Sequence, residues 1–585
     1  MKLGIKLLGL LCWAVLTAGG DLDSAHRSTG KPIVAREAAQ IAAVPELPRV
    51  FLDTTYNPPT GRVINVAEGE NLQVAINAAK PGDIITLQPG ATFVGNFILT
   101  SKSPDKAKPS EEWTVIRSAV PDSCLPPLGN RMTPEYADLL PKIISPNGNA
   151  AISAEDGAHH YRLIGLEIGV VAEEEYNPGL IRLGNGSSLQ SLPDVVPHDL
   201  IVDRCYIHGN KVGGVARGIA LNSARTSIID SYISEIHGVG FDTQAICGWN
   251  GPGPFKIVNN YLEASGENLM FGGADPSIVG LVPADIELRG NHFYKPLRWK
   301  VGAPEYEGTH WTVKNLLELK LVERILIEGN VLENNWADAQ TGFALVFKSV
   351  NQDGSAPWSV TRDVTFINNI VRNSYAGLNL LGRDENQPGQ VMRRVLIRNN
   401  LWEAIDGVRF GGLPGIFLQL SAAPDVTVDH NTVLHSGHVI STYGAISPNF
   451  IYTNNISAHN EYGVKGDGQG TGKDTIDAYF PGAVFRNNVL AGGHGTSYPA
   501  DNYFPALLND VKFIGESEGI YRLATSSPYL KAGFDGKDLG CDFDLLGRSM
   551  TKILAGDSQS RSSALPSTFC DTGRSANLPP RLIRN

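Results

Sequence analysis

The densest group of residues with chemical potential lies in the stretch 242–300. It begins with a loop rich in Gly and Pro that contains Trp249, and it continues through the polar segment around Glu267. It ends at 295–300 with three cations in six residues and a Trp among them, which is more than a simple turn requires. Gly and Pro at this density indicate a shaped loop rather than a plain strand connection.

This set of residues suits β-elimination on a uronate sugar. That reaction needs a partner for the substrate carboxylate, a base for the proton beside it, and help for the leaving oxygen. Arg298 is predicted to pair with the carboxylate through two parallel hydrogen bonds. Lys295 or Lys300 is predicted to act as the base, provided that neighbouring cations and burial lower its pKa. Glu267 completes the set of catalytic candidates.

Substrate binding and metal binding use other members of the same region. Trp249 and Trp299 are predicted to stack on sugar faces. Arg383, in a loop after a short apolar run, is a further candidate for substrate contact, and a solvated turn is the alternative for that loop. The carboxylates of Asp242 and Asp275, together with that of Glu267, are the candidate ligands of a Ca²⁺ ion that neutralises the substrate carboxylate.

Three other interpretations stay open. Glycoside hydrolysis needs two carboxylates about 5–5.5 Å or about 6.5–9.5 Å apart, which Glu267 could form with Asp242 or Asp275. A protein that binds glycans without breaking bonds needs only exposed loops that hold a ligand. In the third interpretation, these cations are solvated turn residues and the acids merely pair with them.

A short phrase that recurs along the chain indicates how these residues are positioned. Alternating apolar runs such as 325–327 and 395–397 are each followed by a corner with an Asn. The recurring Asn residues are Asn260, Asn291, Asn330, Asn369, Asn400, Asn431, Asn455 and Asn488. A unit of about 20–50 residues that repeats in this way is typical of a stacked repeat protein. Weaker copies place Cys205 and Ser231 at the same corner.

The pattern predicts an all-β fold, a single parallel β-helix with elaborated turn loops. Alternation places the Ile, Val and Leu side chains inside and polar side chains outside. An Asn at the corner tolerates a left-handed backbone, and its amide can join the coils above and below into a ladder. An ordinary sandwich is the alternative, but its turns would be spaced about 8–12 residues apart.

The N-terminal end of the repeat has the features of a cap. Residues 71–80 carry apolar side chains at helical spacing, and Pro81-Gly82-Asp83 ends that helix. Residues 84–87 and 93–99 then have the pattern of strands. A solenoid needs a cover over its first coil, because an open stack exposes core and strand edges.

With this opening and the Asn-Asn coils, the chain resembles the pectate-lyase-like superfamily of secreted right-handed parallel β-helix proteins. Residues 521–533 also resemble the closing coil of many secreted members, so that the resemblance covers about 61–545. It implies a right-handed helix with an N-terminal capping helix, but it does not identify an activity, because the superfamily includes lyases, hydrolases, epimerases and adhesins. The sequence matches neither the clustered Asn-x-Asp, Asp-Asp and Arg-x-Lys set of polygalacturonase-like hydrolases nor the ordered Asp and Arg motifs of the best-known pectate lyases. The lyase interpretation therefore rests on the residues of 242–300.

The remaining chain is assigned by composition. Residues 1–20 combine a basic start, an apolar run and small residues, which predicts a signal peptide and a secreted or periplasmic protein. We expect a linker over 21–60, the β-helix with its cap over 61–545, and a polar tail over 546–585. No other apolar run is long enough to cross a membrane.

Charge and cysteine content limit the partners. The formal net charge of −11 argues against nucleic acid, whereas an acidic polysaccharide remains possible where a groove is locally cationic. We expect a monomer. A disulfide between Cys541 and Cys570 is expected to tie down the tail.

Overall fold

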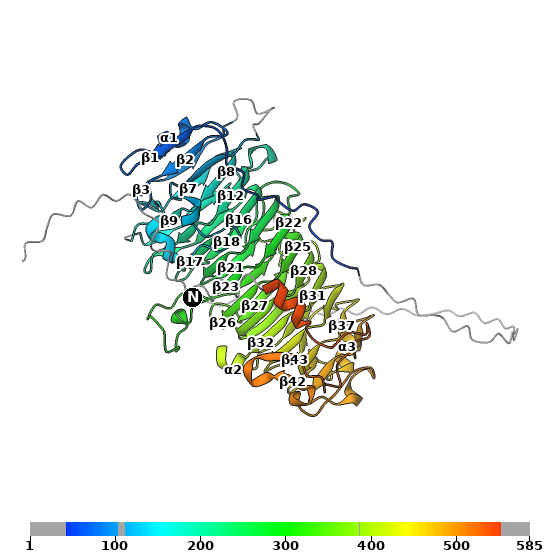
Figure 1. The fold of residues 1–585 in the computed structure, drawn as a ribbon. Helices are drawn as coiled ribbons and strands as arrows, with labels where there is room; N and C mark the ends of the chain where they lie inside the picture. Colours follow the sequence, from blue (N-terminus) through cyan, green and yellow to red (C-terminus); the bar gives the residue numbers. More distant parts are fainter. Residues whose placement is uncertain (1–42, 103–110, 173, 385, 551–585) are drawn as a thin grey trace, which may run out of the picture. The chain divides into compact units, whose positions relative to one another are not determined.

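The computed structural model describes residues 43–102, 111–172, 174–384 and 386–550. The expected signal peptide (1–20), residue Cys570, the first part of the linker and nearly all of the tail lie outside the described residues. The described chain winds through coils of short parallel strands, which stack into three long sheets (Figure 1). The predicted right-handed parallel β-helix is confirmed.

Sheet A has 14 strands. In order they are β1 (Val63–Val66), β2 (Ile84–Leu87), β5 (Thr114–Ser118), β8 (His159–Ile164), β12 (His198–Asp203), β16 (Ala224–Ile229), β19 (Gly253–Val258), β22 (Ala284–Arg289), β25 (Val322–Glu328), β28 (Thr361–Ile367), β31 (Arg393–Arg398), β34 (Val426–Asp429), β37 (Ile451–Thr453) and β40 (Val484–Arg486).

Sheet B has 13 strands. They are β3 (Thr92–Val94), β6 (Lys142–Ser145), β9 (Glu167–Val170), β13 (Tyr206–His208), β17 (Tyr232–Ile236), β20 (Tyr261–Ala264), β23 (His292–Tyr294), β26 (Val331–Asn335), β29 (Ile370–Ser374), β32 (Leu401–Ile405), β35 (Thr432–His435), β38 (Ile456–Ala458) and β41 (Val489–Ala491).

Sheet C has 12 strands. They are β4 (Phe97–Leu99), β7 (Ile152–Ala154), β11 (Ile181–Leu183), β15 (Arg217–Leu221), β18 (Gln244–Gly248), β21 (Glu267–Phe271), β24 (Leu317–Leu319), β27 (Phe343–Lys348), β30 (Ala376–Leu381), β33 (Leu418–Ser421), β36 (Ile440–Thr442) and β39 (Val464–Gly466). Two small pairs lie outside these sheets: β10 (Tyr176–Asn177) with β14 (Gly214–Val215), and β42 (Phe513–Gly515) with β43 (Ile520–Leu523).

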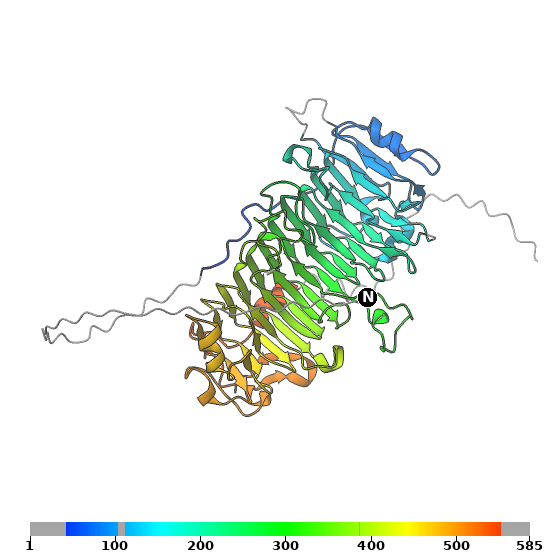
Figure 2. The ribbon, with the colours of Figure 1, turned by 180° about the vertical axis from the view of Figure 1, so that it is seen from behind.

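The core follows from the alternation seen in the sequence. Ile325 and Ile327 on β25 are fully buried in the continuous apolar core, as are the residues at the same register in the neighbouring coils. Because every coil supplies the same inward positions, the core runs along the whole stack. Figure 2 shows the stack of coils from behind. Among the described residues, no helix combines the length and the apolar character that crossing a bilayer needs.

The predicted asparagine ladder is present at the corner between sheets A and B. From Asn260 to Asn488, the backbone N–H and the side-chain Nδ2–H of each Asn donate to Oδ1 of the next at 2.8–3.1 Å. Cys205 and Ser231 begin the ladder as expected, and Asn502, which the repeat did not indicate, ends it. The positive φ that we assigned to the ladder residue falls instead on its predecessor, for example 58° at Asn259.

The expected cap is α1 (Leu72–Ala78), which lies at the N-terminal end of the stack beside β1 and β2 (Figure 1). The side chain of Asn71 accepts a hydrogen bond from the Val74 N–H and so begins the helix. Leu72 and Ile76 reach into the main core and cover its first coil. Two further short helices, α2 (Gly407–Phe410) and α3 (Lys473–Tyr479), lie in turns.

Cys541 corrects one expectation. Its thiol is free and buried, and Sγ lies 2.7 Å from the carbonyl oxygen of Asn400. The predicted disulfide between Cys541 and Cys570 is therefore wrong.

The segment 43–56, which we call the strap, crosses the outer face of sheet A (dark blue in Figure 1). Its backbone N–H groups at Glu46 and Arg49 donate to the carboxylates of Asp363 and Asp285, at 3.0 and 2.9 Å. The strap therefore connects strands that are far apart in the sequence.

Candidate functional site

Polar side chains replace apolar ones where three neighbouring strands of sheet C begin. Arg217, Gln244 and Glu267 lie in register on β15, β18 and β21. The Gln244 Nε2–H donates to Glu267 Oε2 at 2.8 Å, and both side chains are fully buried. A buried carboxyl group is costly to ionise, so its position on this face calls for a functional explanation.

A second buried carboxyl group comes from the next strand. Leu317 and Leu319 on β24 point into the core, so that alternation turns Glu318 to the outer face. Glu318 pairs in register with Met270 on β21, and it too is fully buried. We call Glu267 and Glu318 the acid pair.

Three lysines, which we call the lysine layer, lie over the acid pair. Lys314 Nζ is 2.5 Å from Asp242 Oδ1 and 3.8 Å from Glu267 Oε1. Lys320 and Lys348 each place Nζ 3.4 Å from Glu318 Oε1. The lysine side chains are 14–23% exposed, so they separate the acid pair from solvent and make this face cationic.

The two carboxyl groups of the acid pair differ in their ionisation. Burial, followed by the neighbouring Glu318, raises the pKa of Glu267 to about 7. Burial acts in the same direction on Glu318, but Lys320 and Lys348 outweigh it and hold the pKa of Glu318 below its usual value. Near pH 7 about half of the Glu267 side chains are therefore protonated beside an ionised Glu318, and a protonated acid beside a carboxylate is the arrangement that acid–base catalysis uses.

The carboxyl oxygens at this site already lie near ammonium groups. Lys314 Nζ is 3.8 Å from Glu267 Oε1, and Lys320 and Lys348 Nζ are 3.4 Å from Glu318 Oε1. Calcium requires six to eight oxygen ligands, so the donor set of Glu267 and Glu318 under three lysines does not fit the expected Ca²⁺. Asp242, also expected as a ligand, pairs with Lys314.

Comparison with known proteins finds a likeness to several solved structures. No protein family model and no curated protein sequence matches the chain. A solved alginate lyase of family PL6, AlyGC, is 12% identical with a TM-score of 0.40 over 82% of this chain and 58% of that one. A mannuronic-acid-specific family 6 lyase from the human gut microbiota is 11% identical, with a TM-score of 0.37 over 85% of this chain and 100% of that one. The A-module of the Azotobacter vinelandii mannuronan C-5 epimerase AlgE4 is 13% identical, with a TM-score of 0.35 over 74% and 91%.

The described chain is a parallel β-helix with three long sheets. It spans about 58% of the length of AlyGC. At these identities the likeness concerns the fold of the β-helix, and the chemistry has to be argued from its own residues.

Lys295 lies inside the β-helix rather than on its surface. Its side chain is fully buried, and burial lowers the pKa of its amine to about 7. Nζ donates to the carbonyl oxygens of Ala264, Ser265 and Gly266 and to Asn268 Oδ1. These contacts hold the turn that carries Glu267, and they remove Lys295 from direct contact with a substrate.

In the segment 297–300, the side chains of Arg298 and Trp299 contact neighbouring protein groups rather than the acid pair. Arg298 donates to Glu235 at 3.0 Å and to Glu263 at 3.1 Å, so its guanidinium is already paired. Trp299 is 1% exposed and packs in an apolar cluster with Trp311, which excludes a role as a sugar platform in this conformation. Lys300 follows the 3-10 turn η4 (Leu297–Trp299) and is half-buried.

Trp249 and Arg383 lie on sheet C with the acid pair. The guanidinium of Arg217 is 5.4 Å from the Trp249 ring centroid, so Trp249 adjoins the column that contains Glu267. Arg383 lines a cavity of about 940 Å³ beyond the end of β30, whose Leu381 pairs in register with Lys348. Both positions are compatible with contact to a long ligand.

Asp275 has a structural position instead of a place beside Glu267. Its carboxylate accepts backbone N–H groups of Gln352, Asp353 and Ser355 at 2.6–3.0 Å, and also the Ser355 hydroxyl at 2.9 Å. These bonds hold the 352–355 turn, so Asp275 does not join Glu267 as a calcium ligand.

Sequence reasoning missed Glu318 and the lysine layer. A signal was present, because 316–321 reads Leu-Leu-Glu-Leu-Lys-Leu, with charges at alternate positions of an apolar strand. In a β-helix such charges must face outward, on the same face as one another.

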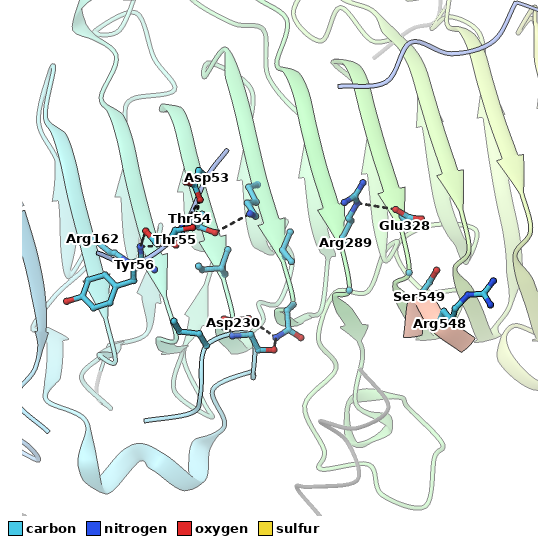
Figure 3. Close-up of a pocket in the computed structure, with 18 residues that line it drawn as sticks. Asp53, Thr54, Thr55, Tyr56, Arg162, Asp230, Arg289, Glu328, Arg548 and Ser549 are labelled. Carbon is cyan, nitrogen blue, oxygen red and sulfur yellow. Dashed lines mark hydrogen bonds and ion pairs between the residues drawn. The ribbon is translucent and has the colours of Figure 1, made fainter. Parts of the chain in front are cut away.

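A cavity of about 730 Å³ lies over sheet A, between the strap and the segment 548–549 (Figure 3). Its charged groups are engaged with one another or with the strap. Arg289 pairs with Glu328 at 3.1 Å, and Lys256 Nζ donates to Leu52 O and Thr54 Oγ1 at 3.1 Å each. The residues around this cavity therefore hold the strap in place. The acid pair remains the stronger candidate for chemistry.

Proposed function

We propose that the protein is a polysaccharide lyase that cleaves a uronate-containing polysaccharide by β-elimination on the face of sheet C. The acid pair, with opposite ionisation and beneath a cationic layer, is the observation that carries this proposal. β-Elimination requires the substrate carboxylate to be neutralised, one proton to leave the adjacent carbon, and one proton to reach the leaving oxygen.

The lysine layer supplies the first requirement. A uronate carboxylate that approaches this face meets Lys314, Lys320 and Lys348, whose partners at present are Asp242 and the acid pair. The substrate carboxylate takes the place of Asp242 and the acid pair as the partner of the lysines. The lysines then move away from the acid pair, and the α-carbon of the substrate comes to lie beside it. Charge-assisted hydrogen bonds of this kind are the strong ones in proteins.

The acid pair supplies the two proton transfers. The ionised Glu318 takes the proton from the carbon beside the carboxylate, while the protonated Glu267 gives its proton to the glycosidic oxygen as the C–O bond breaks. The electron pair of the C–H bond becomes the new C=C bond. The acid pair still holds one proton at the end, now on Glu318 instead of Glu267.

The flanks of the site fit a polymer. Sheet C carries a cavity of about 390 Å³ around Arg182 on one side of the acid pair and the cavity with Arg383 on the other. Six strand spacings of about 4.8 Å separate β11 from β30, which amounts to roughly 29 Å along the stack. A chain of several sugars can therefore contact both flanks and the centre.

The arrangement argues against glycoside hydrolysis by the acid pair. Hydrolases hold their two carboxyl groups about 5–5.5 Å or about 6.5–9.5 Å apart, on opposite sides of the scissile bond. Here Glu267 and Glu318 interact directly with each other, and each affects the other's pKa. A binding protein without turnover is the second candidate, and the full burial of both carboxyl groups is the observation that favours it.

One experiment separates these functions. The purified protein is incubated with alginate, pectate and glycosaminoglycans, each with and without Ca²⁺. Absorbance of an unsaturated uronate supports the lyase, new reducing ends without that absorbance indicate a hydrolase, and retention of glycan with neither signal indicates a binder. The lyase proposal fails if no acidic polysaccharide gives the unsaturated product.

A further inference from the structure

A group of imidazoles lies on sheet A, at the start of β8 and β12. His159, His160 and His198, together with Asp199, form what we call the histidine cluster. The rings of His159 and His198 stack with centroids 5.0 Å apart and planes 2° apart, and the His160 ring lies 5.0 Å from His159 at 88°. Three of the chain's 13 histidines thus gather at one place outside the site on sheet C.

The β-helix does not need imidazoles at this position. In the next two coils, the residues in register with His198 are Ala224 and Gly253. Along the same edge, other left-handed positions carry simple ion pairs, such as Asp285 with Arg324 at 2.8 Å. Asp199 and Arg225 form the equivalent pair here, and His160 occupies the same left-handed position in the preceding coil. His159 and His198 are therefore the additions to the structural ladder.

The donor atoms converge on one point. One ligand atom each from His160, His198 and Asp199 lies within 4.8 Å of the other two. Ligand atoms about 2.0–2.1 Å from a tetrahedral zinc ion lie about 3.3 Å apart, so the three donor atoms have to close by at most about 1.5 Å. Beside them, His159 is 4% exposed, and its Nε2 has no hydrogen-bond partner within the described chain.

The rings of His159 and His160 also contact each other through their nitrogens. Their Nδ1 atoms are 2.8 Å apart, so one ring donates a hydrogen bond to the other.

We propose that His160, His198 and Asp199 bind a divalent transition-metal ion of the Zn²⁺ class. Two imidazole nitrogens and one carboxylate oxygen are ligands that zinc, nickel and copper share, whereas Ca²⁺ requires six to eight oxygens. Because the ligands come from β8 and β12, the ion ties two adjacent coils together.

Arg225 is the competitor of this ion. Its guanidinium donates to Asp199 at 2.6–3.0 Å and lies 2.8 Å from His198 Nδ1, while its side chain is 47% exposed. Metal binding must displace the Arg225 guanidinium from Asp199. Because the Arg225 side chain is partly exposed, it can rotate away into the solvent. Removal of the Arg225 guanidinium should therefore strengthen metal binding, whereas loss of a ligand should weaken it.

Calorimetric titration of the untagged, chelator-treated full chain with ZnCl₂ tests the proposal. We expect one strong site per chain, at least about tenfold weaker binding in His160→Ala and His198→Ala, and tighter binding in Arg225→Ala. The control His494→Ala removes an exposed imidazole elsewhere and should bind Zn²⁺ like the wild type. Ca²⁺ at the same concentration should not compete.

Trp113 provides a second readout, because its ring lies 5.1 Å from that of His160. Cu²⁺ at the site should quench its fluorescence, and Trp113→Phe should abolish that change while leaving Zn²⁺ binding intact. The proposal is wrong if the wild type shows no stoichiometric site, if the two histidine variants bind as the wild type does, or if Arg225→Ala binds no more tightly.

Discussion

Glu267 and Glu318 lie side by side under three lysines, and their pKa values move in opposite directions. Burial is the largest influence on both groups, but at Glu318 the charges of Lys320 and Lys348 and the hydrogen bonds together outweigh it. The two residues are far apart in the sequence, and adjacent strands of sheet C bring them together.

The first prediction concerns the proton that Glu267 holds. Glu267→Gln keeps the shape and the contact with Gln244 but cannot deliver a proton. General acid–base catalysis contributes about 10²–10⁴-fold, so we expect kcat for the unsaturated product to fall by that factor. Glu305→Gln, an exposed carboxyl group away from sheet C, should leave kcat unchanged. Full activity of Glu267→Gln would remove Glu267 from the mechanism.

The second prediction is a pH dependence of stability. The pKa of Glu267 rises from its ordinary value of 4.5 to about 7 on folding, so the folded chain keeps a proton that the unfolded chain loses. This contribution is complete below about pH 4.5 and is lost as the pH rises through about 7. Relative to Glu267→Gln, the free energy of unfolding of the wild type should fall by about 1–3 kcal/mol across this window. Denaturant unfolding at several pH values measures it, and parallel curves for the two proteins would contradict the assignment.

The third prediction concerns the lysine layer. Lys348→Met keeps the apolar stem and removes a charge that lies 3.4 Å from Glu318. A lost hydrogen bond to a charged group costs about 1.5–3 kcal/mol, so we expect KM for an acidic polysaccharide to rise roughly 10- to 100-fold. Lys473→Met, at an exposed position on α3, is the matched control. Equal KM values for the two variants would exclude Lys348 from substrate binding.

The fourth prediction concerns the asparagine ladder. Asn330 is fully buried; its Nδ2 donates to Leu288 O and Asn369 Oδ1, and its Oδ1 accepts two bonds from Asn291. Asn330→Ala leaves these partners unsatisfied, and a cost of about 2–4 kcal/mol is expected. Chemical denaturation measures it against the exposed control Asn509→Ala. A loss below about 0.5 kcal/mol would mean that the ladder adds little to stability.

The sequence alone determined the architecture. The recurring Asn and the alternation of runs such as 325–327 specify parallel coils, because only a stacked repeat buries the same positions in every turn. The same reasoning found the cap at 71–80, since a short amphipathic helix depends on local pattern.

Only the tertiary structure decided which of these residues meet. The excursion between β23 and β24 is long, and its length does not reveal where Lys295 and Arg298 will point. Packing directs Lys295 into a turn of carbonyl groups and Arg298 toward Glu235, and it brings Glu318 beside Glu267 instead. A repeat fixes the direction in which coils stack, but contacts between turns depend on loops whose paths are set by burial and charge across coils.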